Sequence, residues 1–270
     1  MRLRIRHETT HRYELAPGWL AQWIRLTPID TPAQRVLSWR VLDERSDDPV
    51  AFADGYGNAC HLFTRRDATR VSRIVAEGEV ETLAVPALAA PEPLPPRYFL
   101  RASELTAPTP EIRALALEAR ASAGGDAQGE LLALAALVNA RIVHSPARTD
   151  VATRAGAARA GGAGVCQDRA HVFLAAARAL EYPARYASGY LEGAAASEAG
   201  AMHAWGEVWL GALGWLALDP SSGERTGVAH VRVAVGLDYT EAAPIRGVRR
   251  GGAEERLDVR VQIQASQQQQ

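Results

Sequence analysis

Hydrophobic and polar positions alternate with a period of two through the first third of the chain. Leu3, Ile5 and His7 alternate with arginines, and residues 37–41 alternate in the same way. This pattern predicts half-buried β-strands, because successive side chains of a strand point to opposite faces. Short segments rich in Pro, Gly, Asp and Asn separate the runs, as is typical of turns. Residues 1–85 are therefore predicted to form a small β-sandwich-like domain.

A proline-rich segment follows, and we predict that residues 86–110 are a linker. Five prolines fall between positions 86 and 96, and proline removes a backbone donor and interrupts regular structure. The hydrophobic period then changes to that of a helix. Thr109 and Pro110 are suited to the N-cap and first position of a helix. Residues 128–142 and 165–180 each repeat apolar side chains at helical spacing.

Beyond the last helical run, short apolar segments that are typical of strands continue to Ile263. Helices that are followed by strands, and that do not alternate with them, predict an α+β domain whose sheet is antiparallel. We assign this α+β core to residues 111–264. The Gln-rich residues 265–270 are predicted to be a disordered tail.

Composition and charge narrow the class of protein. The chain has 270 residues, of which 47% are hydrophobic, and its 30 basic and 31 acidic residues nearly balance. A balanced charge gives no reason to expect a nucleic-acid or membrane-surface partner. The N-terminus lacks the apolar run of a signal peptide, and the sequence has no 18-residue apolar stretch. A cytoplasmic location is therefore the expectation.

Cys166 lies where a glycine-rich loop becomes a helix, in the sequence Gly161-Gly-Ala-Gly-Val-Cys-Gln-Asp168. The partial positive charge of a helix N-terminus favours a thiolate, and its free N–H groups can stabilise an oxyanion. The other cysteine, Cys60, has the surroundings of a half-buried strand residue. Two distant cysteines cannot form a disulfide framework, and together with dispersed histidines they lack zinc-ligand spacing. No metal or cofactor is therefore expected.

His203 opens a predicted strand whose two faces differ. One face carries His203, Trp205, Glu207 and Trp209, whereas the intervening residues are small or apolar. We predict that the apolar face packs on the core and that the His203 face lines a cleft. The other six histidines, among them His230, are interpreted as ordinary exposed or satisfied side chains.

Asp219 ends the next short strand and precedes a proline. Such an aspartate is most often a turn former, but beside His203 it could orient the imidazole of a nucleophilic triad. A plain four-residue loop over 211–214 would pair Asp219 with Gly206, on the wrong face for His203. The triad therefore requires a bulge or a wider loop in this hairpin.

These residues resemble the bacterial transglutaminase-like proteins of the papain-like cysteine superfamily. The resemblance rests on 164–168, on Pro183-Ala-Arg-Tyr with Ser188-Gly-Tyr, on 203–205, on 214–220 and on 230–239. The β region at the N-terminus is similar to the domain that precedes the core in that family. Arg169, His144 and Gly206 depart from the usual family residues, and the first two could alter the lining of the cleft, which affects the expected substrate choice and not the chemistry.

The resemblance implies a papain-like core with Cys166 as nucleophile, His203 as general base and acid, and Asp219 as the orienting group. Gln167 and Trp205 become candidate substrate-binding residues. For Trp205, packing against a strand neighbour is an equally good interpretation, and for Asp168 a structural role at the helix terminus is preferred. The implied substrate is a peptide or protein amide, attacked at a glutamine or peptide bond through a thioester.

The sequence leaves the acceptor open, because an amine and water would use the same triad and the same thioester. Transglutaminase, cysteine peptidase and amidase activities therefore all fit. The alternative from a different class is a non-catalytic binding or scaffolding module that retains the fold. A metal enzyme is the least favoured interpretation.

Overall fold

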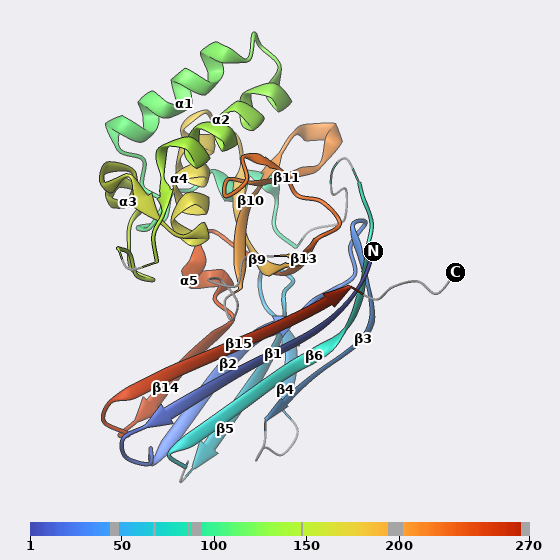
Figure 1. Cartoon of the computed structure of the whole chain (residues 1–270), viewed down its shortest axis with the longest axis vertical. Coiled ribbons are helices and arrows are strands. Elements are labelled where there is room, and N and C mark those ends of the chain that lie inside the picture. The colour runs from blue at the N-terminus through green and yellow to red at the C-terminus, as the bar shows by residue number, and fades with distance from the viewer. Residues whose placement is uncertain are drawn as a thin grey trace.

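A computed structural model of the chain describes residues 1–43, 49–66, 69–85, 87, 93–146, 148–193 and 202–265. It has two parts, a β-sandwich and an α+β core (Figure 1). This confirms the expected fold class. No helix among the described residues is long and apolar enough to cross a membrane. Of the predicted tail at 265–270, Ala265 is the last residue of a strand and 266–270 lie outside the described residues, as do 86 and 88–92 of the proline-rich segment.

The sandwich consists of two four-stranded antiparallel sheets. One sheet has the order β15-β1-β6-β3 and the other β14-β2-β5-β4. Its strands from the first part of the chain are β1 (Arg2–Tyr13), β2 (Trp19–Thr27), β3 (Gln34–Asp43), β4 (Val50–Ala53), β5 (Ala59–Arg66) and β6 (Val71–Thr82). Ile24, Phe63 and Ile74 are buried between the sheets. The alternation at the start of β1 is confirmed, since Leu3 and Ile5 are buried and Arg2 and Arg4 are exposed.

The last two strands of the chain belong to the sandwich and not to the core. β14 (Ile245–Arg250) pairs with β2, and β15 (Glu255–Ala265) pairs with β1 along its whole length. The expected core range of 111–264 therefore differs from the structure at its C-terminal end. The hydrophobic pattern of β15 correctly indicated a strand, but a pattern does not state which strand is its partner.

The described part of the segment between the two domains contains the short 3₁₀ helix η1 (Pro96–Leu100). Three core helices follow: α1 (Pro110–Ser122), α2 (Ala127–Arg141) and α3 (Ala155–Gly161). Thr109 caps α1 as predicted, by accepting a hydrogen bond from the N–H of Ile112. The short helix α3 was not predicted from its Gly- and Ala-rich sequence.

The core sheet has five antiparallel strands in the order β12-β11-β10-β9-β13. Helix α4 (Cys166–Ala179) packs on one face of it. The strands are β9 (Ala184–Leu191), β10 (His203–Trp209), β11 (Trp215–Asp219), β12 (Glu224–Arg225) and β13 (His230–Gly236). The small pair β7 (Val143–His144) and β8 (Ala163–Gly164), the 3₁₀ turn η2 (Gly211–Leu213) and the short helix α5 (Tyr239–Ala242) complete the described elements.

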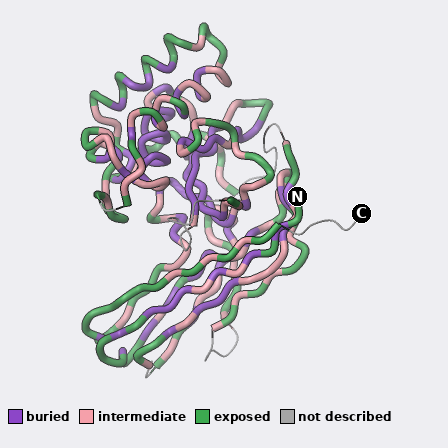
Figure 2. Tube along the Cα trace, in the orientation of Figure 1, coloured by how far each residue is buried: buried purple, intermediate pink, exposed green. Residues whose placement is uncertain are grey.

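Both faces of the core sheet are buried, whereas the strands of the sandwich mostly alternate between buried and exposed positions (Figure 2). Ala204, Val208 and Leu218 face the helices. On the opposite face, Trp215 packs against Phe99 of η1. This double cover decides which residues of β10 can reach a cleft.

The sandwich is joined to the core along the edge strand β13. The side-chain amide of Gln34 donates to the carbonyl of Arg232 and accepts from its N–H, each at 2.8 Å. Asn58 makes the same pair of 2.8 Å hydrogen bonds with Val235. The two amides thus satisfy backbone groups that an edge strand would otherwise leave unpaired. The sandwich is therefore fixed against the sheet that carries the candidate site.

Candidate active site

Cys166 is the first residue of α4 and is half-buried. The loop before it is held by Asp168, whose Oδ2 accepts hydrogen bonds from the N–H of Val165 (2.8 Å) and from the hydroxyl of Thr149 (2.7 Å). Asp168 therefore has the structural role that was preferred for it. The first N–H groups of the helix have no intrahelical partner, so they are available beside the thiol to a developing oxyanion.

Close packing of β10 on α4 brings the start of that strand to the thiol. Gly206 faces α4 so closely that a Cβ atom there would lie 2.5 Å from the ring of Phe173. The absence of a side chain at Gly206 is therefore required by this approach. The Sγ atom of Cys166 lies 4.0 Å from the carbonyl oxygen of Met202, the residue before His203.

The β10–β11 hairpin has the wider loop that the triad requires. Trp209 pairs with Trp215 and Gly206 with Leu218, so the loop has five residues and contains η2. Gly211 and Gly214 both have positive φ in this loop, a conformation that favours glycine. The register moves by one residue relative to a plain four-residue loop. Asp219 consequently lies on the same face as His203.

His203 and Asp219 form a buried pair. The Nε2–H of His203 donates to Oδ2 of Asp219 at 2.7 Å. Burial by itself would lower the pKa of His203, but the hydrogen bonds and charges of Asp219 and Cys166 outweigh it and raise the pKa from 6.5 to about 10. Because Nε2 is bound to Asp219, the other ring nitrogen, Nδ1, is the one left for the thiol. The structure thus brings the three predicted triad residues together.

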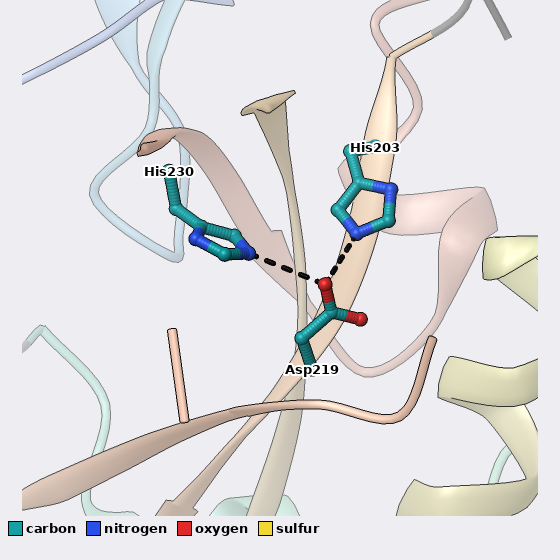
Figure 3. A group of neighbouring side chains, drawn as sticks. All are labelled: His203, Asp219 and His230. Carbon is teal, nitrogen blue, oxygen red and sulfur yellow. Dashed lines mark hydrogen bonds and ion pairs between the residues drawn. The ribbon is translucent and has the colours of Figure 1, made fainter. Parts of the chain in front are cut away.

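A second histidine contacts the same carboxylate, and sequence reasoning had assigned it no role. Nε2 of His230, at the start of β13, lies 3.2 Å from Oδ2 of Asp219 (Figure 3). Its Nδ1 accepts a hydrogen bond from the N–H of Gly227, so Nε2 carries the proton and donates. The N–H of Ser221 binds the other oxygen, Oδ1, at 2.8 Å.

These three donors fix the orientation of Asp219. Burial would raise the pKa of this carboxyl group, but the hydrogen bonds from His203 and His230 hold it well below its usual range. His230 matched the family pattern in the sequence, and this was the one signal that could have identified it. Its proximity to Asp219 depends on the pairing of β13 with β9, which the sequence did not reveal.

His203, Asp219 and His230 are also the described residues whose side chains could hold a metal ion. Their ligand atoms lie within 4.8 Å of one another. The sequence lacks the close ligand spacing that is typical of zinc sites, but the sheet brings these distant residues together. In the present arrangement, however, both Nε2 atoms point at one carboxylate oxygen and are satisfied by hydrogen bonds to it (Figure 3). A metal ion would have to replace both of these protons.

The thiol and the imidazole open into a cavity of about 420 Å³. Gln167 lines it beside Cys166, as does His144, which departs from the family pattern. Arg169 does not line it. Instead, the buried Arg169 donates to the carbonyls of Ile142 and Ser221 and so ties the first turn of α4 to the segment after Asp219.

We predicted that the whole His203 face of β10 lines the cleft. His203 does line it, but the prediction was wrong for the other residues of this face. Trp205 is only 2% exposed and packs behind the triad, with its ring in contact with those of His203 and His230. It does not line the cavity that contains Cys166. Glu207 forms buried ion pairs with Arg185 and Arg232. The cause is the cover on the second face of the sheet, so that His203 alone of the four residues on this face lines the cavity with Cys166.

Family models match both parts of the molecule. Residues 3–81 match the bacterial transglutaminase-like N-terminal region, and residues 113–220, which include Cys166, His203 and Asp219, match the transglutaminase-like superfamily. The chain is a bacterial transglutaminase-like protein. Its family resemblance therefore holds for both the sandwich and the core.

Relatives and a solved structure extend this resemblance over nearly the whole chain. An uncharacterized protein of Mycobacterium leprae is 29% identical over 275 residues, covering 97% of this chain and 98% of its own length. One from Mycobacterium tuberculosis is 28% identical and covers 92% of this chain and 87% of its own. The crystal structure of a candidate cysteine protease from Cytophaga hutchinsonii shares the fold, with a TM-score of 0.76 and 19% identity over 98% of this chain and 90% of that protein.

Proposed function

We propose that this transglutaminase-like protein is an enzyme that transfers an acyl group from a glutamine or peptide amide through a thioester on Cys166. The observation that carries the proposal is the buried hydrogen bond from His203 to Asp219, with Cys166 on the other side of the imidazole at a helix N-terminus. This is the arrangement of nucleophile, base and orienting group that thiol-dependent acyl transfer requires. The family match and the shared fold support a thiol-based activity.

In the first step, the thiolate of Cys166 attacks the amide carbon, and N–H groups of the first turn of α4 bind the oxyanion. The C–N bond then breaks. The imidazolium of His203 gives its proton to the leaving nitrogen, which departs as ammonia from a glutamine side chain or as an amine from a peptide bond. Throughout, Asp219 holds the ring and stabilises its positive charge.

In the second step, His203 removes a proton from the acceptor, which attacks the thioester carbon and releases the thiolate. An amine acceptor gives a new amide, and water gives a carboxylic acid. The triad serves both acceptors equally. We therefore leave the acceptor to experiment.

A screen of glutamine-containing peptides, with and without a fluorescent primary amine, tests the proposal. Release of ammonia, cleavage of the peptide or incorporation of the amine is measured, with Cys166→Ala as the matched control. We expect turnover by the natural chain and its loss in Cys166→Ala, whose circular dichroism and melting temperature should stay close to those of the parent. Incorporation of the amine identifies a transferase, and ammonia or cleavage alone identifies a hydrolase.

Turnover by Cys166→Ala comparable to that of the parent would contradict the role of the thiol. If no peptide reacts, labelling with iodoacetamide at neutral pH decides between an enzyme and a non-catalytic module. A thiol activated by its surroundings reacts quickly, whereas an inert thiol reacts slowly. Slow labelling together with the absence of turnover would favour the binding or scaffolding module.

A further inference from the structure

The cavity at Cys166 has two walls, and one of them is formed by the sandwich. The core contributes the triad wall, with Cys166, Gln167 and His203. The facing wall, here called the sandwich wall, is formed by residues of β1, β14 and β15, namely His7, Thr9, His11, Ile245, Leu257 and Val259. Residues from both ends of the chain thus line the same cavity as the nucleophile.

The sandwich wall has no charged residue of its own apart from its histidines, and the carboxylate beside it, Glu255, is already bound to His11. Among the described residues that line the cavity there is no Arg, Asp or Glu. Burial lowers the pKa of His7 from 6.5 to about 4, so this residue is neutral near pH 7. Its ring nitrogens already contact the hydroxyl groups of Thr9 and Tyr190. A charged substituent packed against this wall would therefore lose part of its hydration without gaining a partner ion there, since the charged His203 lies on the facing triad wall.

Two residues of β15 give the sandwich wall its apolar character. Leu257 and Val259 both line the cavity, and Leu257 is 60% exposed although it is a large hydrophobic residue. A volume of about 420 Å³ falls in the range of small-molecule sites. The hydrogen bonds of Gln34 and Asn58 to β13 hold the sandwich in place, so the wall is present before a ligand binds.

We propose that the sandwich wall is a binding subsite for the acyl donor and that it selects donors with an uncharged, apolar substituent next to the reacting amide. This inference rests on the proposed function, because it places the donor at Cys166. It assigns the sandwich a direct part in substrate choice. The apolar substituent packs against Leu257 and Val259 while its amide carbon lies at the thiol.

The test uses alkylating probes that need no turnover. Rates of labelling of Cys166 in the full chain are measured with chloroacetamide, N-benzylchloroacetamide and N-(4-carboxybenzyl)chloroacetamide, each divided by its rate with glutathione. Mass spectrometry of peptides separates Cys166 from Cys60. Burial of a phenyl ring corresponds to a preference of about tenfold or more. We therefore expect the benzyl probe to exceed chloroacetamide by about tenfold and the carboxybenzyl probe to lose this advantage.

Leu257→Asp should abolish the preference for the benzyl probe, and Val259→Thr should reduce it. Val248→Asp is the matched control, because Val248 is a 67% exposed sandwich residue that does not line the cavity. It should keep the full preference. Since Leu257 and Val248 are both exposed, neither change should unfold the protein, and melting temperatures verify this.

A benzyl-to-chloroacetamide ratio near one in the natural chain would overturn the subsite. So would an equal loss of the preference in Leu257→Asp and Val248→Asp. The absolute labelling rate with chloroacetamide, which has no apolar substituent, measures the reactivity of the Cys166 thiol separately. Slow labelling by every probe contradicts the proposed function, whereas the ratio between probes still decides whether the sandwich wall binds apolar groups.

Discussion

The core and the sandwich bury their residues in different ways. The core holds the proposed catalytic groups, and the sandwich contributes the facing wall of their cavity. In the core, a sheet covered on both faces holds Asp219, His203 and a second histidine in fixed contact. In the sandwich, each sheet buries one face between the sheets and turns the other outward. Part of the inner face, where Thr9 pairs with Val259 and His11 with Leu257, lines the cavity that contains Cys166. The core thus holds the groups whose charges must be oriented, and the sandwich contributes a separate set of side chains to the same cavity.

The largest loss of activity is expected from substitutions in the core. His203→Ala should lower kcat/KM by roughly 10³–10⁴-fold, because proton transfer to the leaving nitrogen is lost. Asp219→Asn should cost less, because the amide oxygen still accepts a hydrogen bond from the ring but does not offset its charge. Steady-state kinetics on a reactive peptide measures both. Equal losses in two folded variants would show that Asp219 acts only structurally.

Asp219→Asn also has a structural cost that His203→Ala lacks. In the natural protein the N–H of Ser221 donates to Oδ1 of Asp219. If the amide oxygen of the variant takes the place of Oδ2, its NH₂ group takes the place of Oδ1 and faces this N–H. Two donors would then oppose each other in a buried site. Thermal unfolding of the variant should accompany the kinetics, so that the loss of activity is compared only between folded proteins.

The pH dependence follows from the raised pKa of His203. With a value of about 10, the imidazole is protonated at neutral pH and loses its proton only as the pH approaches that value. Its contribution to stability is complete below about 6.5, the unfolded value, and is lost as the pH rises through about 10. NMR titration of the His203 ring should show this midpoint, and Asp219→Asn should move it downward. An ordinary midpoint near 6.5 in the natural chain would mean that the triad is not assembled.

A smaller effect should come from His230, which donates a hydrogen bond to Asp219 and whose ring lies 6.0 Å, centroid to centroid, from that of His203. His230→Phe removes the N–H that binds Oδ2 and should lower kcat by about tenfold, since a hydrogen bond to a charged group contributes about 1.5–3 kcal/mol. His230→Gln keeps an N–H donor and should retain most of the activity. The His203 titration provides the second measurement: it should change in His230→Phe and remain close to that of the parent in His230→Gln. Identical behaviour of the two variants would show that His230 only fills space.

The smallest effect concerns the contact between the two domains. Gln34→Ala removes two hydrogen bonds to the backbone of Arg232 and should lower the free energy of unfolding by about 1–3 kcal/mol. Denaturant titration measures this change, with Gln264→Ala as the control because Gln264 is an exposed glutamine of the same domain. A change no larger than that of the control would mean that the sandwich and the core do not stabilise each other through β13.

Local patterns predicted the elements whose signals are complete within a few residues. Thr109 and Pro110 gave the start of α1, and the glycine-rich loop gave Cys166 at the start of α4. The alternation around Leu257 correctly predicted a strand, but it was assigned to the wrong domain. Its partner, β1, lies more than 240 residues earlier in the chain. Hydrophobic periodicity predicts that one face of an element is buried, but it does not identify the distant segment that covers this face.

The sequence by itself determined the chemical groups of the site: a thiol at a helix N-terminus, an imidazole at the start of a strand and a carboxylate at the end of the next. The tertiary structure decided how these groups meet. It widened the hairpin loop so that Asp219 shares a face with His203, paired β13 with β9 so that His230 reaches Asp219, and covered the second face of the sheet so that Trp205 is excluded from the cavity. Each of these outcomes depends on strand register and on packing between segments far apart in the chain, which are set by the summed burial of the whole fold and not by any local spacing.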